Sequence, residues 1–142
     1  MLILPALFSP FSFWLILLAF LASHFVTGFS ISIVFQTAHV MPETEFPLPD
    51  EQGVMESERL VHQMITTSNY APRSKVFSWL IGGLNYQVEH HLFPNICHIH
   101  YPKIAPIIQA TALEFGVPYL TKRTFFDAVR SHYKMLRELG KA

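Results

Sequence analysis

The sequence predicts an all-α fragment of a membrane protein, with one complete transmembrane helix, the remnant of a preceding one and a cytosolic helical region. Of the 142 residues, 51% are hydrophobic, a high share for a water-soluble domain. No Asp, Glu, Lys or Arg occurs before Glu43. The apolar N-terminal stretch is longer than the roughly 7–15 apolar residues of a secretory signal, and no basic segment precedes it. We therefore expect residues 1–40 to form a transmembrane region and residues 41–142 a cytosolic one.

Charge balance and cysteine content narrow the classes of function. Ten basic residues balance ten acidic ones, so the basic excess of a nucleic-acid-binding face is missing. Cys97 is the only cysteine, which excludes a disulfide within the chain and fits a reducing compartment. We expect membrane lipid as a partner, and no nucleic acid.

The apolar stretch contains one interrupted segment and one long segment. Residues 1–8 are apolar, but Pro5 and the Ser9-Pro10 pair interrupt them, because proline lacks a backbone donor and clashes with the preceding helical turn. We interpret this segment as the end of one span and a tight turn. A helix over residues 11–38 would be about 42 Å long, against a hydrocarbon core of about 30 Å. Only a helix satisfies every backbone group of a single segment in lipid, so we expect one full crossing here.

His24 lies in the middle of this expected span. Ionisable groups at such depth usually face a protein interior and not lipid. We favour a neutral, hydrogen-bonded packing histidine over a metal ligand.

An acidic segment follows the span. Residues 42–58 hold six acidic residues, three prolines and no basic residue, which indicates an exposed loop. Residues 54–67 can form a partly amphipathic helix, which residues 69–72 should end. Within residues 77–94 we expect a short helix that stops before Pro94, since the residue preceding a proline avoids the helical region.

Two further helices are expected near the C-terminus. We expect residues 103–115 to form the first of these helices, and Gly116 to end it. Thr124 and Asp127 have the spacing of a capping box for the last helix. Its apolar stripe is expected to contain Phe125, Val129, Tyr133 and Leu136, with His132 at the surface.

The C-terminal segment also predicts an orientation in the membrane. Between Lys122 and Lys141 there are six basic and two acidic residues. Basic residues accumulate on the cytoplasmic side of membrane proteins, so the C-terminal region should be cytoplasmic.

Gln87, His90 and His91 form the most informative cluster. Their spacing of i, i+3 and i+4 places them within an arc of about 100° on a helix, while Glu89 points the other way. Imidazole is a preferred ligand of iron, zinc and copper. Taken alone the signal is modest, because histidine pairs at this spacing often only cap or pack.

The wider context resembles a known family. The stretch NYQVEHHLFPNICHIHYPKIAPI, with VFQTAHVMPETEFPLPD and HQMITTSNYAPRSKVFSWLIGGLNYQ before it, resembles the membrane fatty acid desaturases over nearly the whole chain. The likeness is to the C-terminal part of front-end and linoleoyl-CoA desaturase-like members. In these proteins the third histidine box is commonly Q-x-x-H-H, as in residues 87–91.

This resemblance implies a di-iron centre at the cytosolic mouth of a membrane bundle, where oxygen is activated to remove two hydrogens from a fatty acyl chain of acyl-CoA or acyl-lipid. His90 and His91 correspond to iron ligands, and Gln87 to a ligand or near-ligand. His39 matches a further histidine ligand just beyond the last span; the alternative is an interfacial polar residue that marks the helix end.

Other histidines are expected to support the site and not to bind iron. Cys97, His98 and His100 lack recognised zinc spacing. The residues expected around the ligands, packing against them or orienting them, are His62, Glu89, His98 and His100.

Two parts of such an enzyme are not found in this sequence. The first two histidine boxes, H-x-x-x-H or H-x-x-x-x-H and H-x-x-H-H, are absent, so the iron ligands must be completed from outside this chain. The His-Pro-Gly-Gly motif of a fused electron donor is also absent, so electrons would come from a separate cytochrome b5-type protein or ferredoxin. We therefore expect a fragment that is inactive alone. A non-catalytic membrane fragment and a fatty acyl hydroxylase of the same chemistry remain open.

Overall fold

The computed structural model describes residues 2–141, which divide into two compact units between Ile33 and Val34. The first unit contains α1 (Ile3–Phe8) and most of α2 (Phe13–His39). Both helices form where expected, and Ser9 caps α1 through its backbone N–H to the carbonyl of Pro5. Helix α2 is long and apolar enough to cross a membrane. That α1 is the end of a preceding span stays a prediction.

His24 bonds within its own helix. Its Nδ1 donates to the carbonyl oxygen of Phe20 at 2.9 Å. The expectation of a hydrogen-bonded histidine is confirmed.

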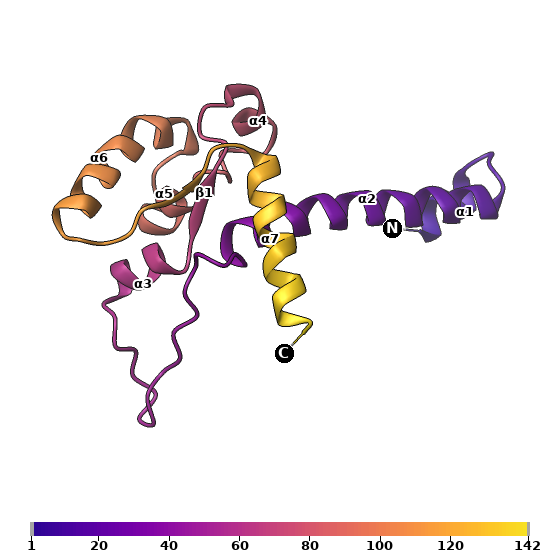
Figure 1. Cartoon of the computed structure of the whole chain (residues 1–142). Coiled ribbons are helices and arrows are strands. Elements are labelled where there is room, and N and C mark those ends of the chain that lie inside the picture. The colour runs from indigo at the N-terminus through magenta and orange to yellow at the C-terminus, as the bar shows by residue number, and fades with distance from the viewer. Residues whose placement is uncertain (1, 142) are drawn as a thin grey trace. The chain divides into compact units, whose positions relative to one another are not determined.

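The second unit, residues 34–142, is mostly helical but also holds a small sheet (Figure 1). Strand β1 (Ser68–Tyr70) pairs in parallel with β2 (Leu120–Lys122), with Asn69 opposite Thr121. The expectation of an all-α chain is therefore wrong at these two segments. Each strand is only three residues long, too short for a period-2 pattern to reveal it.

Helix α3 (Arg59–Ile65) is shorter than the expected segment 54–67. The carboxylate of Asp50 accepts hydrogen bonds from the backbone N–H groups of Gln52 and Val54, at 2.9 and 2.7 Å. This turn holds Val54 out of a helix, because aspartate offers the backbone a competing partner.

The segment expected to hold one short helix contains two. They are α4 (Lys75–Leu80) and α5 (Gln87–Leu92), joined by a turn in which Gly82 and Gly83 have positive φ. Helix α5 ends before Pro94, as predicted.

The last two helices match their predicted ends closely. The 3-10 helix η1 (His98–His100) leads into α6 (Tyr101–Glu114), and Gly116 follows with φ of +68°. Helix α7 (Phe125–Leu139) begins with the predicted capping box of Thr124 and Asp127.

The buried face of α7 differs from the predicted stripe. Ala128 and His132 are buried, whereas Tyr133 is 66% exposed and Leu136 47% exposed. The expectation that His132 lies at the surface is wrong, because its Nδ1 donates to the carbonyl oxygen of Val40 at 2.8 Å. A histidine with a buried backbone partner is stable inside the fold, so the helix turns this face inward.

Two hydrophobic clusters form the core, and the second of them includes Val88 of α5. One joins Ala38, Tyr70, Ala71 and Ala128; the other joins Met64, Val88, Ile108 and Ala112. Helix α5 contacts α3, α6 and β1, so it is held on several sides (Figure 1).

Candidate metal site

Helix α5 is fixed by a buried hydrogen-bond network on one of its sides. Glu89 is fully buried, and its two oxygens accept hydrogen bonds from the Tyr119 hydroxyl at 2.6 Å and the Asn69 amide at 2.7 Å. The Asn69 side-chain oxygen accepts from the backbone N–H of Val88 at 2.9 Å. Burial raises the pKa of Glu89, while the hydrogen bonds from Tyr119 and Asn69 oppose this rise. These contacts give Glu89 a positioning role on α5.

His39 and His91 face each other although 52 residues separate them. Their Nε2 atoms lie 3.4 Å apart and their ring centroids 5.1 Å apart. Nδ1 of His39 lies 3.4 Å from the carbonyl oxygen of Thr66, which can only accept a hydrogen bond. This contact places the proton of neutral His39 on Nδ1 and leaves Nε2 with a lone pair directed at His91.

The separation of the two Nε2 atoms fits shared coordination. Two imidazole nitrogens that each lie about 2.1 Å from one cation are about 3.0–3.4 Å apart for bond angles of about 90–109°. Burial lowers the pKa of His91 to about 4, with further lowering from the neighbouring charges of His39 and His90. His91 is therefore neutral near pH 7, the form that binds metals.

His90 completes a row of three imidazoles. Its ring centroid lies 5.7 Å from that of His91, and its Nδ1 lies 3.3 Å from the hydroxyl of buried Tyr101. A hydrogen bond on one ring nitrogen orients the other nitrogen, as is usual around histidines that bind metals.

Among Gln87, His90 and His91, Gln87 has the side chain with the fewest hydrogen bonds. It is 1% exposed, and neither its Oε1 nor its Nε2 has a hydrogen-bond partner among residues 2–141. An unpartnered buried amide costs free energy, so such groups in folded proteins usually meet a partner. Imidazole suits metals of the iron, zinc or copper class, and the free amide of Gln87 is a further possible donor on the same helix.

A hollow of about 330 Å³ lies beside this cluster. It is lined by His39, Glu45, Phe46, Pro47, Leu48, His62 and Thr66. Nδ1 of His62 is buried and has no partner within the described part of the chain. The structure thus places His62 next to His39, at one edge of the candidate site.

His98 and His100 lie on η1, directly before Tyr101 and α6. Both are exposed in η1. A Cβ atom added at Gly83 would lie 2.6 Å from Cβ of His98, so His98 packs on the glycine turn.

Sequence reasoning missed Asn69, Tyr101 and Tyr119. All three contact the cluster or its anchor through side-chain hydrogen bonds between residues 11 to 30 positions apart. By sequence alone Asn69 is only the start of a segment that ends a helix. Asn69 stands between Ser68 and Tyr70, and nothing in this local sequence indicates that its amide is buried.

The described residues do not enclose a metal by themselves. Across positions 2–141, no group of three or more His, Cys, Asp or Glu side chains is arranged to hold one ion. Two imidazoles meet and a third lies beside them, so further ligands are needed to close a centre.

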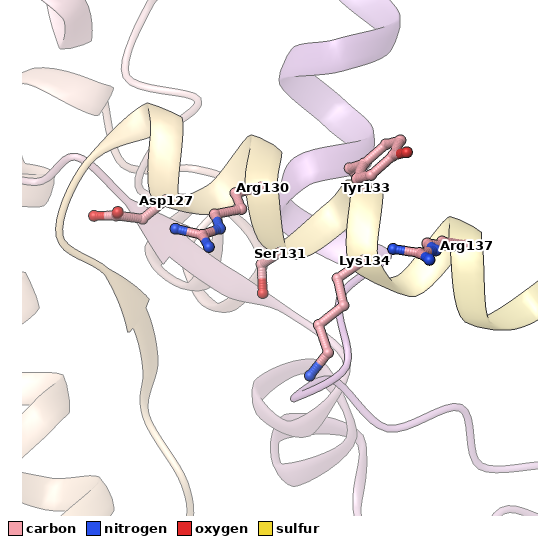
Figure 2. Close-up of a pocket in the computed structure, with 6 residues that line it drawn as sticks. All are labelled: Asp127, Arg130, Ser131, Tyr133, Lys134 and Arg137. Atoms are coloured by element: carbon pink, nitrogen blue, oxygen red, sulfur yellow. The ribbon is translucent and has the colours of Figure 1, made fainter.

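Another hollow, of about 500 Å³, runs along α7 (Figure 2). Its lining comes from one helix and consists of Asp127, Arg130, Ser131, Tyr133, Lys134 and Arg137. A single helix cannot surround a small molecule, and the candidate metal ligands are elsewhere, so we assign this hollow no catalytic role.

Comparison with known proteins supports one family. The family model described as "Fatty acid desaturase" matches residues 1–123. No solved structure is significantly similar to the chain.

Curated relatives carry desaturase names. The chain is 41% identical over 140 residues to the acyl-lipid (8-3)-desaturase of Physcomitrium patens, covering 99% of this chain and 29% of the relative. It is 47% identical over 116 residues to the sn-1 linoleoyl-lipid 6-desaturase of Synechocystis, covering 81% and 32%. For the acyl-lipid (8-3)-desaturase of Mortierella alpina the identity is 42% over 139 residues, covering 98% and 31%. These are front-end desaturases, and the chain spans about a third of their length.

Proposed function

The chain belongs to the fatty acid desaturase family, and from that premise we propose that it supplies part of the di-iron site of an O2-dependent desaturase. The enzyme would introduce a double bond into a fatty acyl chain. One observation carries the proposal: the Nε2 atoms of His39 and His91 lie 3.4 Å apart at the ends of two different helices. Iron, on which fatty acid desaturases in general depend, would supply the oxidation that removes hydrogen from unactivated methylene carbons.

The residues of this chain would hold and orient the metal. We propose His39, Gln87, His90 and His91 as ligands, with Gln87 binding directly or through water. His62, Glu89, His98 and His100 would support them. Glu89 does so by tying α5 to Asn69 and Tyr119, which keeps both histidines of the helix in a fixed direction.

The remaining ligands would come from outside these residues. Four donors are fewer than a di-iron centre needs, so we propose that the chain is inactive unless a complementary region is present. Residues 1–40 would form the transmembrane region and residues 41–142 the cytosolic one, with the C-terminus cytoplasmic.

The proposal extends to the substrate and the electron donor. The names of the relatives favour an acyl chain esterified in a lipid, with acyl-CoA as the other candidate. A separate cytochrome b5-type protein or ferredoxin would deliver electrons.

A reconstitution experiment tests these roles. The chain is co-expressed with a region containing the first two histidine boxes of a relative, and both bound iron and unsaturated fatty acids are measured. We expect His91→Ala to lower bound iron at least about tenfold, since the loss of a partner that only orients a ligand already has an effect of that size. His24→Ala is the matched control, because it removes an imidazole that bonds only within α2.

Unchanged iron content in both His91→Ala and His39→Ala would contradict the ligand assignment. Iron binding without any product would instead favour the non-catalytic alternative, which the incomplete set of ligands among residues 2–141 also supports.

A further inference from the structure

Helix α7 carries a stripe of alternating aromatic and arginine residues. Phe126, Arg130, Tyr133 and Arg137 follow one another at steps of four, three and four residues, which places them within an arc of about 60°. Phe126 is 83% exposed and Tyr133 66% exposed, and both arginines are exposed. We call these four residues the aromatic–arginine stripe.

The fold itself does not use this stripe. The helix buries Ala128 and His132 on its opposite side. Within residues 2–141 neither arginine forms an ion pair, whereas Lys134 pairs with Glu138 at 3.8 Å. In Figure 2, Tyr133 and Lys134 project from different sides of α7. The stripe therefore presents two positive charges, without ion pairs among the described residues, that alternate with two aromatic rings.

Hydrogen bonds attach α7 to the residues that directly follow α2. His132 donates to the carbonyl oxygen of Val40 at 2.8 Å, and Val40 is the first residue after α2. The Ser131 hydroxyl donates to a carboxylate oxygen of Glu43 at 3.1 Å. If α2 crosses a bilayer, α7 lies at the level where that crossing ends.

We propose that α7 lies on the membrane surface with the aromatic–arginine stripe against anionic phospholipid headgroups. Tyrosine favours the headgroup level, where its ring is shielded and its hydroxyl stays wet, and the phenylalanine ring adds apolar contact. Arginine side chains extend from there to the phosphate groups, and each guanidinium can donate two parallel hydrogen bonds to phosphate oxygens. The proposal shares with the proposed function only the membrane crossing of α2, and it requires no iron.

The test uses the full chain in lipid vesicles, with two variants that each keep a single tryptophan. The stripe reporter carries Tyr133→Trp together with Trp14→Phe and Trp79→Phe. The span reporter carries Trp79→Phe alone, which leaves Trp14 to report on α2. The vesicles contain phosphatidylcholine alone or mixed with phosphatidylglycerol, and lipids brominated on their acyl chains quench tryptophan that reaches the bilayer.

We expect the span reporter to be quenched in both kinds of vesicle and the stripe reporter only when phosphatidylglycerol is present. Added salt should reduce the quenching of the stripe reporter. Arg130→Gln should lower the ratio of docked to undocked helix about fivefold, the effect of one basic side chain near an anionic surface. Lys134→Gln is the control with the same change in charge, and a smaller effect is expected because Lys134 lies off the stripe.

Four results would overturn the proposal. If the stripe reporter is not quenched in anionic vesicles while the span reporter still is, the stripe is no lipid contact and the crossing of α2 stands. Equal quenching of the stripe reporter in neutral vesicles, or quenching that follows the protein-to-lipid ratio, would indicate an apolar contact or a second copy of the chain. An unquenched span reporter would overturn the crossing itself, whereas the iron content of the reconstituted enzyme is measured separately.

Discussion

Gln87 and Glu89 are buried to the same degree but differ in how they are satisfied. Both oxygens of the Glu89 carboxylate accept hydrogen bonds, whereas the Gln87 amide meets no partner among residues 2–141. A satisfied buried group holds structure in place, and an unsatisfied one implies a missing partner. Glu89 thus anchors one side of α5, and the free amide of Gln87 on the other side is available for the proposed metal.

Asn69→Ala tests the anchoring side. It removes a donor to Glu89 and the acceptor of the Val88 N–H, so two buried groups lose partners. We expect the free energy of unfolding to fall by about 2–4 kcal/mol. Urea unfolding of the detergent-solubilised chain, followed by circular dichroism, measures this loss.

Two variants complete that experiment. Tyr119→Phe removes a single hydrogen bond to Glu89, and its expected cost is smaller, about 1–2 kcal/mol. Gln109→Ala changes an exposed amide on α6 and should stay within about 0.5 kcal/mol. If Asn69→Ala were as mild as Gln109→Ala, Glu89 would not anchor α5.

At the scale of elements, the glycine turn between α4 and α5 sets where α5 begins. Gly82 and Gly83 have φ of +62° and +75°, a region that L-residues with side chains rarely adopt. Of the two, only Gly83 also meets a neighbour, since an added Cβ would lie 2.6 Å from Cβ of His98. The turn therefore carries two separable constraints, backbone conformation and close packing.

Gly82→Ala and Gly83→Ala separate these constraints. The Cβ of Gly82→Ala meets nothing within 4 Å, so this variant should cost about 1–2 kcal/mol from backbone strain alone. Gly83→Ala adds a steric overlap with η1 and should cost at least about 1 kcal/mol more. The comparison is made by thermal unfolding of both variants. Equal losses would mean that His98 moves aside freely and does not fix the turn.

At the scale of the whole second unit, one ion pair joins segments 79 residues apart. Lys122 of β2 donates to Glu43, which follows α2, with 2.7 Å between Nζ and Oε1. Burial tends to raise the pKa of Glu43, but the hydrogen bond and charge of Lys122 and the Ser131 hydroxyl bring it below the usual 4.5. The pair therefore stabilises the fold only while Glu43 is ionised.

The pH dependence of stability follows from the lowered pKa of Glu43. Because the folded pKa is lowered, the contribution of Glu43 is present above pH 4.5 and is lost as pH falls through the folded pKa. Glu43→Gln should lower stability at pH 7 by at most about 1 kcal/mol, since the pair is partly exposed. The difference from the wild type should shrink to zero in strong acid.

Denaturant unfolding at a series of pH values checks this expectation. Glu138→Gln serves as a comparison, because it removes the longer and more exposed pair with Lys134. A difference between wild type and Glu43→Gln that persists unchanged at low pH would contradict the role given to the charge of Glu43.

Much of the helical framework could be predicted because its signals are local. The long apolar helix, the capping box at Thr124, the stop before Pro94 and the role of Gly116 each depend on residues within a turn or two of one another. The family was likewise evident from the motif around Gln87 and His91.

The missed features involve partners distant in sequence. The pairing of β1 with β2 joins residues about fifty positions apart, and His132 is buried because it reaches the carbonyl of Val40. Neither feature leaves a periodic pattern in the sequence, because each depends on the distant segment that packs against it after folding.

By itself the sequence determined the class of this protein: a helix long and apolar enough to cross a membrane, a polar helical region and a helix that carries Gln87, His90 and His91. Only the tertiary structure decided that His39 meets His91, that Glu89 is an anchor and that the outer face of α7 stays open. The physical reason is the distance along the chain over which each kind of interaction acts. Helix periodicity and capping act over a few residues, whereas a metal site and a buried carboxylate need partners that only chain folding brings together.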